Sequence, residues 1–136
     1  MKILFAKNTS IVPGSRNAKE YPWFDELYEL LKKDFVPQVK EIEGVLPFEE
    51  ILEMIKWADV VISVDSFLPH MIRFHNIDKK VIVLWGKSDP NIFGYKEHIN
   101  LLKDRKFLRN EQFKWWKDEP YLEEAFIRPE EIIEYL

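Results

Sequence analysis

The sequence predicts a single α/β domain over residues 1–136, a three-layer Rossmann-like fold with a mostly parallel sheet of four to five strands. Two observations predict this fold class. Two short apolar runs rich in Val and Ile, Asp59–Val64 and Lys80–Trp85, are separated by about fifteen residues, enough for a crossover helix. Neither run alternates strictly between apolar and polar residues, which is typical of parallel strands buried on both faces. The two runs and their connection therefore form a βαβ unit.

The amino-terminal third predicts another strand and a helix. Lys2–Ala6 (KILFA) is a strand-length apolar run, and the long polar loop Lys7–Tyr21 that follows it is a natural ligand-binding loop. Pro22 suits the first turn of a helix. The residues after it have the spacing of a buried helical stripe, and they are Phe24, Leu27, Tyr28 and Leu31.

Three further elements are predicted along the chain. Val36–Glu43 has charged residues beside its apolar ones, which favours a strand at the edge of the sheet. A second helix is predicted from Pro47 to about Ala58, with one apolar face and acidic residues in its first turn. Pro129 begins a closing helix, whose predicted inner face consists of Ile132, Ile133 and Leu136.

Polar residues follow several of the predicted strands, where an open α/β sheet binds its ligands. Asp65-Ser66 comes directly after one strand, with His70 close behind, and the turn at Gly86–Pro90 follows the next. Asp65, Ser66 and His70 are therefore the first candidates for functional residues. The alternative is that Asp65 or Ser66 only caps the helix, and that His70, like His75 and His98, is an ordinary surface or packing residue.

Composition excludes several classes of function. The net charge of −4 argues against nucleic acid or an anionic membrane as the main partner. The absence of Cys excludes disulfides, thiolate metal sites and a thiol nucleophile. No apolar run approaches the roughly 20 residues of a membrane span, and Met1–Lys7 does not resemble a signal peptide. We expect a soluble cytoplasmic protein with no membrane span and no metal.

The last third contains two oppositely charged segments. Lys103–Lys117 has six Lys or Arg against two acids, interleaved with aromatic residues, whereas Glu119–Leu136 has six acids and one Arg. Interleaved bases and aromatics can bind single-stranded nucleic acid. The reading we prefer is that the aromatics pack on the domain while the charges face solvent. The two segments are also expected to pair with each other.

Several of these residues form a pattern found in a known family. The run Ala58–Ser66, His70 four residues later, and then Gly86 and Asp89-Pro90 resemble the carboxyl-terminal half of glycosyltransferase family 9, the ADP-heptose:lipopolysaccharide heptosyltransferases. The loop Ser15-Arg16-Asn17-Ala18-Lys19, followed by Pro22, is similar to a conserved loop of that family. Pro129–Ile132 is similar to its closing helix.

The resemblance implies half of a GT-B fold that holds a nucleotide-diphosphate sugar, with no cofactor or metal. It implies that Lys19 contacts the donor's phosphates, that Asp65 bonds the sugar, and that Ser66 and the amides after it hold the diphosphate. His70 would lie close to the same site. The remaining donor-binding candidates are Ser15 and Asp89. An ammonium and a helix amino terminus both stabilise the charge of a departing nucleotide diphosphate.

The chain departs from the family pattern in three places. Phe67 stands where the family has Gly, a strand–helix unit carrying a Glu for the nucleoside has no counterpart, and the family's acceptor-binding amino-terminal domain is absent. We therefore expect a donor-binding domain that acts with a separate chain or as a homodimer. The alternative is a degenerate, non-catalytic relative that works as a protein-interaction module. A hydrolytic use of Asp65 is disfavoured, because no metal-binding carboxylate cluster accompanies it.

Overall fold

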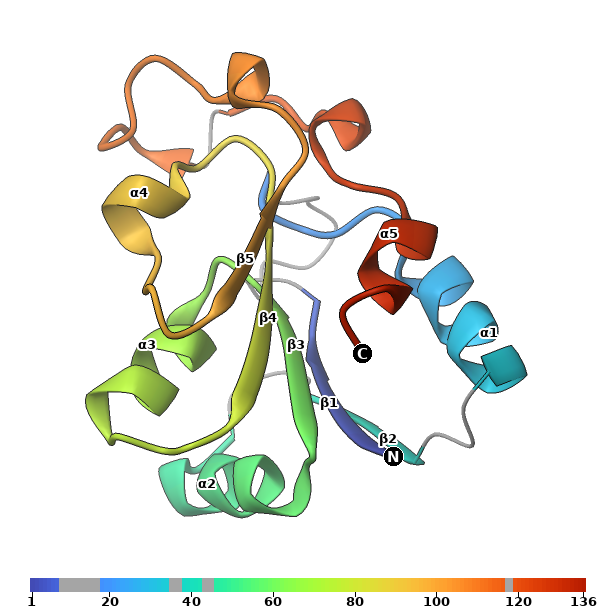
Figure 1. Ribbon diagram of the computed structural model, residues 1–136. Helices are drawn as coiled ribbons and strands as arrows, with labels where there is room; N and C mark the ends of the chain where they lie inside the picture. Colours follow the sequence, from blue (N-terminus) through green and yellow to red (C-terminus); the bar gives the residue numbers. More distant parts are fainter. Residues whose placement is uncertain (8–17, 35–37, 43–45, 117–118) are drawn as a thin grey trace.

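The structure is a computed structural model of the 136-residue chain, and it describes residues 1–7, 18–34, 38–42, 46–116 and 119–136. It confirms the predicted α/β class (Figure 1). One sheet contains five strands in the order β2-β1-β3-β4-β5, and every neighbouring pair is parallel. The strands are β1 (Lys2–Ala6), β2 (Gln38–Glu41), β3 (Val60–Val64), β4 (Lys80–Trp85) and β5 (Ile99–Leu102).

Helices cover both faces of the sheet. On one face lie α1 (Phe24–Asp34) and α5 (Pro129–Ile133), and on the other lie α2 (Phe48–Trp57), α3 (Phe67–Phe74) and the short α4 (Pro90–Phe93). Two short 3₁₀ helices, η1 (Arg105–Phe107) and η3 (Glu123–Ala125), belong to the last third of the chain. The three-layer arrangement predicted from the sequence is therefore present.

The two halves of the core follow from strand periodicity. In β1, Ile3 and Phe5 contact the α1 and α5 side, whereas Leu4 and Ala6 contact the α2 and α3 side. Every residue of β3 is buried, because helices cover both of its faces. The sequence predicted burial on both faces because this run does not alternate between apolar and polar residues, and the structure confirms it.

The edges of the sheet differ in how well the sequence predicted them. The strand with charged neighbours is β2, which is an edge strand with alternating exposure and no fully buried residue. The other edge is β5, a strand that the sequence analysis did not locate. Its residue Asn100 interrupts the apolar pattern, but the Asn100 side chain accepts a hydrogen bond from Trp85 Nε1 at 3.0 Å and donates to the carbonyl of Tyr95 at 2.8 Å.

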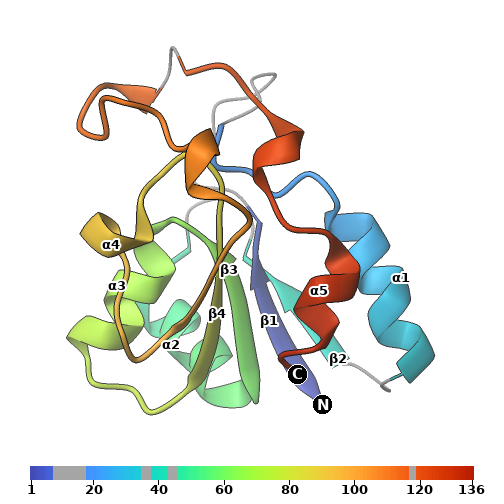
Figure 2. The same ribbon diagram turned by 45° about the horizontal axis from the view of Figure 1, so that its top comes forward.

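Residues 103–116 and 119–128, here called the cover segment, run from the end of β5 to the start of α5. Figures 1 and 2 both show this segment beyond the carboxyl ends of the strands. Phe126 of the cover segment is buried and packs in the α1-side core. The carboxyl edge of the sheet, where ligands of parallel α/β folds bind, is therefore lined by this segment as well as by the loops after β3 and β4.

Candidate functional site

Two predicted site residues meet at the carboxyl edge of the sheet. Lys19 comes from the loop after β1, and Asp65 comes directly after β3. The Nζ atom of Lys19 lies 3.0 Å from Oδ2 of Asp65. The parallel pairing of β1 with β3 explains this meeting, because it brings the loops that leave the two strands to the same edge.

The Lys19–Asp65 ion pair is largely withdrawn from solvent. Asp65 is 6% exposed, and its Oδ2 has an ion-pair partner but no hydrogen-bond partner among the described residues. The ammonium of Lys19 also lies 4.6 Å from the ring centre of Trp116, a residue of the cover segment. Charges held this way are costly to leave uncompensated, so a ligand that enters here must replace the interactions that it breaks.

Ser66 has the structural role that the sequence analysis offered as the alternative. It is the N-cap of α3, and its hydroxyl accepts a hydrogen bond from the backbone N–H of Leu68 at 3.4 Å. The same hydroxyl lies 3.2 Å from the Ser63 hydroxyl. The side chain is buried beside Asp65, which places the amino terminus of α3 at the ion pair. Phe67, the first residue of α3, is half exposed at this point.

His70 interacts with a different part of the structure. Its Nδ1 lies 2.7 Å from the hydroxyl of Tyr95, and the two rings meet edge to face. Tyr95 in turn contacts the ring of His98. The described contacts of His70 therefore join α3 to the segment before β5, and none of them involves Asp65 or Ser66.

Asp89 is held by an arginine and by the start of a helix. Both of its carboxylate oxygens accept hydrogen bonds from Arg105, at 3.1 and 2.8 Å, and Oδ1 also caps α4 through the N–H of Asn91. The bonds from Arg105 hold the pKa of Asp89 below its ordinary value. Asp89 is thus an ionised carboxylate that fixes η1 of the cover segment to the loop after β4.

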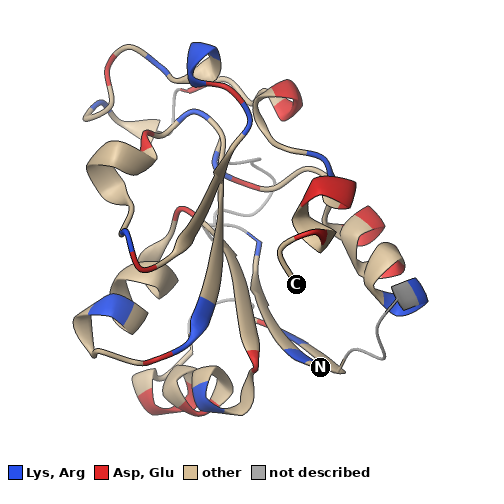
Figure 3. Ribbon diagram, in the orientation of Figure 1, with Lys and Arg blue, Asp and Glu red and all other residues tan. Residues whose placement is uncertain are grey.

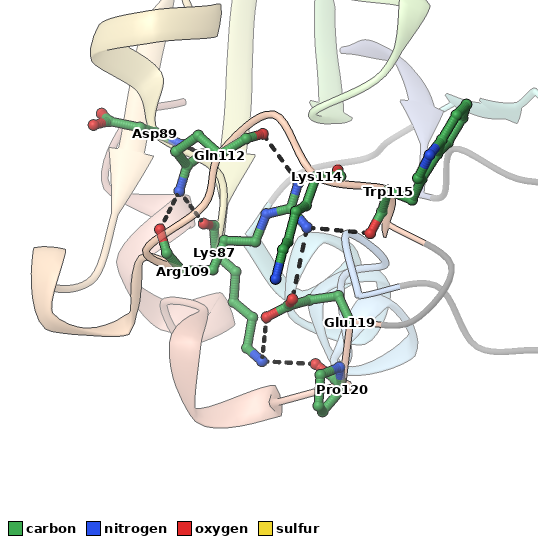
Figure 4. Close-up of polar contacts among 8 residues, drawn as sticks. All are labelled: Lys87, Asp89, Arg109, Gln112, Lys114, Trp115, Glu119 and Pro120. Carbon is green, nitrogen blue, oxygen red and sulfur yellow. Dashed lines mark hydrogen bonds and ion pairs between the residues drawn. The ribbon is translucent and has the colours of Figure 1, made fainter.

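A second ionic network ties the cover segment together (Figure 4). Glu119 Oε1 lies 3.1 Å from Lys87 Nζ, and Glu119 Oε2 lies 3.6 Å from Nη1 of Arg109.

The guanidinium of Arg109 also donates to the carbonyls of Gln112 and Lys114, and it lies 3.4 Å from the ring centre of Trp116. These contacts position Trp116 over Lys19.

The expected pairing of the two charged segments is confirmed, because Arg109 of the basic segment binds Glu119 of the acidic one. Figure 3 shows basic and acidic residues at this end of the molecule. The expectation for the aromatics is only half right. Phe107 packs against the core and Trp116 is partly buried, but Phe113 and Trp115 are 82% and 83% exposed.

The remaining predictions concern other parts of the chain. Ser15 lies outside the described residues, as do Arg16 and Asn17. His75 is exposed and His98 is buried, in keeping with surface and packing roles. No helix in the described ranges is long and apolar enough to cross a membrane. The described residues also contain no group of three or more His, Asp or Glu side chains that would hold a metal ion.

Sequence reasoning missed the residues of the cover segment that complete the carboxyl edge. Arg105, Arg109, Trp116 and Glu119 were noted only as members of charged or aromatic runs. The run of bases and aromatics was a signal that this segment is unusual, but it gave no partner for any single side chain.

Comparison with known proteins gives no relative: no protein-family model, curated protein sequence or solved structure matches this chain. A functional assignment therefore rests on the geometry of the carboxyl edge and on the sequence pattern.

Proposed function

We propose that this chain binds a nucleotide-diphosphate sugar at the carboxyl edge of its sheet, as a glycosyltransferase-like donor-binding domain. In this proposal Lys19 contacts the diphosphate, Asp65 bonds the sugar, and the amino terminus of α3 at Ser66 faces the phosphates. A separate chain or a second copy supplies the acceptor site and the catalytic base.

The observation that supports the proposal most is the contact between Lys19 Nζ and Asp65 Oδ2 at 3.0 Å. The resemblance assigned these two residues, from different loops, to neighbouring parts of one ligand. An ammonium that is paired with a carboxylate can exchange this partner for a phosphate oxygen, because both are anionic acceptors. The released Asp65 carboxylate is then free to accept hydrogen bonds from sugar hydroxyls.

Calorimetric titration of the purified chain with ADP-, UDP- and GDP-sugars tests the proposal. We expect saturable binding to the wild type that weakens about tenfold or more in Lys19→Ala and in Asp65→Ala, because each variant removes a charged hydrogen-bond partner. Arg128→Gln is the matched control, since it breaks an exposed ion pair with Glu26 away from the site. Absence of binding at millimolar ligand would overturn the proposal.

A second candidate function, a protein-interaction module, is favoured by a different observation. The side chains of Phe113 and Trp115 project from the cover segment with most of their surface in solvent. Exposed aromatics on a stable loop are typical of interface anchors. Sedimentation equilibrium of the wild type and of Phe113→Ser/Trp115→Ser tests self-association. Loss of a concentration-dependent dimer in the variant would support this candidate, and a monomer in both would argue against self-association.

A further inference from the structure

A groove of about 520 Å³ lies within the cover segment, separate from the Lys19–Asp65 pair. Residues 106–111 form most of its lining, and Lys87, Lys114 and Glu119 complete it. None of the five candidate donor-binding residues that the structure describes lines this groove. Its size is within the range of sites that bind small molecules.

The charges that line the groove are unbalanced. Four cationic side chains, of Lys87, Lys106, Arg109 and Lys114, face two carboxylates, of Glu111 and Glu119, which leaves a net charge of +2. Lys87 and Arg109 share the single carboxylate of Glu119. The exposed ammoniums of Lys106 and Lys114 form no ion pair among the described residues. A dianion would balance the groove.

The wall of the groove is held in place before any ligand arrives. Arg109 has a side chain that is 5% exposed, and its Nε is buried with no hydrogen-bond partner among the described residues. The Gln112 side chain donates to the carbonyls of Lys87 and Arg109, at 2.9 and 2.8 Å, and so fixes the two sides of the groove together (Figure 4). A preformed wall reduces the entropy lost on binding.

The groove also offers apolar surface to the rest of a ligand. Phe107 and Leu108 are half-buried members of the lining. The ammonium of Lys106 lies 5.1 Å from the ring centre of Phe107, which keeps a positive charge beside this apolar surface. The arrangement fits an anionic group attached to an organic body.

We propose that this groove is a second binding site, which takes a phosphate or diphosphate ester of a small organic molecule. Lys106 and Lys114 contact the phosphate oxygens, while Lys87 and Arg109 raise the positive potential beneath them. Phosphate is favoured over a single carboxylate because the groove has two uncompensated positive charges. The groove shares no described residue with the proposed donor site, and the two are linked only through Trp116, which contacts Arg109 on one side and Lys19 on the other.

Inorganic pyrophosphate is the probe for the test, titrated by calorimetry at constant ionic strength so that general screening does not change. We expect saturable binding that weakens about tenfold or more in Lys106→Gln/Lys114→Gln. The matched control is Lys33→Gln/Lys96→Gln, which removes the same charge from exposed positions elsewhere. Lys19→Ala should leave pyrophosphate affinity in the groove unchanged.

A variant with the opposite effect makes the test sharper. Glu119→Gln removes a carboxylate from the lining and raises its net charge from +2 to +3, so pyrophosphate should bind several-fold more tightly. Thermal unfolding of each variant establishes that it is folded. If Glu119→Gln does not fold, the comparison of Lys106→Gln/Lys114→Gln with its control tests the proposal by itself. No binding to the wild type, or equal weakening in the Lys33/Lys96 control, would overturn the proposal. Loss on Lys19→Ala alone would assign pyrophosphate to the donor site and would also overturn it.

Discussion

Phe126 lies over Gly86 so closely that a Cβ atom added to Gly86 would come within 2.6 Å of Phe126 Cζ. Gly86 follows β4 at the carboxyl edge, and Phe126 is buried in the cover segment. The absence of a side chain at residue 86 thus permits the cover segment to pack against the end of the sheet.

Gly86→Ala is therefore expected to destabilise the chain by about 1–3 kcal/mol, because a rigid, buried ring must move to make room. Urea unfolding, monitored by tryptophan fluorescence, measures the change. Phe126→Leu replaces the flat ring with a smaller side chain, so Gly86→Ala should cost less in that background. An effect below about 0.5 kcal/mol in the wild-type background would contradict the expected clash.

Tyr21 joins the start of the chain to the end of the cover segment. Its buried hydroxyl donates a hydrogen bond to the carbonyl of Ile127 at 2.9 Å. Tyr21→Phe leaves this carbonyl without its partner, and we expect a loss of about 1–2 kcal/mol in the free energy of unfolding. Tyr135→Phe, which changes an exposed side chain, serves as the control and should have almost no effect.

The same tyrosine predicts a loss of stability in alkaline solution. Burial raises the pKa of Tyr21 well above its ordinary value, although the nearby Arg128 opposes this shift. Above about pH 10 the phenol ionises in the unfolded chain while the folded chain keeps its proton. The free energy of unfolding should therefore fall as the pH rises, and it should fall less steeply in Tyr21→Phe. Equal slopes in the two proteins would argue against this origin.

The bidentate contact between Arg105 and Asp89 predicts a carboxylate that resists protonation. Arg105→Gln should raise the pKa of Asp89 toward its ordinary value, because the bonds from Arg105 are the main cause of the lowered pKa. Carbon-13 NMR of the side-chain carboxyl groups follows this titration. In the wild type, the free energy of unfolding should fall as the pH is lowered, because the ionised Asp89 stabilises the folded chain. This fall should be smaller in Arg105→Gln. Lys106→Gln removes a neighbouring charge and should shift the Asp89 pKa far less.

The buried His98 predicts a loss of stability in mildly acidic solution. Burial lowers the pKa of His98, so the ring stays neutral in the folded chain when it would be protonated in the unfolded chain. Below about pH 6.5 the free energy of unfolding should fall, and His98→Leu should reduce this dependence. In proton NMR the His98 ring should titrate below the ordinary histidine pKa of about 6.5. Titration of the His98 ring at or above that ordinary value would contradict the prediction.

The sequence was sufficient for most of the fold because its strongest signals are local. The Val- and Ile-rich runs at β3 and β4 are buried on both faces, and this burial is what their composition indicated. The strand β5 gave no such signal, because it has four residues and one of them is Asn100. Its stability comes from pairing with β4 and from hydrogen bonds of the Asn100 side chain, neither of which a local pattern contains.

The candidate site was less predictable for the same reason. The positions of Asp65 and Ser66 after β3 were expected, since a strand followed by a cap is a local feature. The family resemblance assigned Lys19 and Asp65 to one ligand, but the partner of Asp89, Arg105, lies in a segment for which the sequence indicated no partner. Periodicity does not specify the path of an irregular segment, so the exposure of Phe113 and Trp115 also went unforeseen.

The hydrogen bond from Tyr21 to Ile127 spans 106 positions, and the packing of α1 against α5 spans a similar separation. During synthesis from the amino terminus, the α1 face of the sheet stays without Phe126 and Ile132 until almost the whole described chain has left the ribosome. Closing so long a loop also slows folding relative to a domain built from neighbouring contacts. The apolar side chains of α1 and β1 that share a core with Phe126 and Ile132 therefore lack these partners until the last residues of the described chain are made.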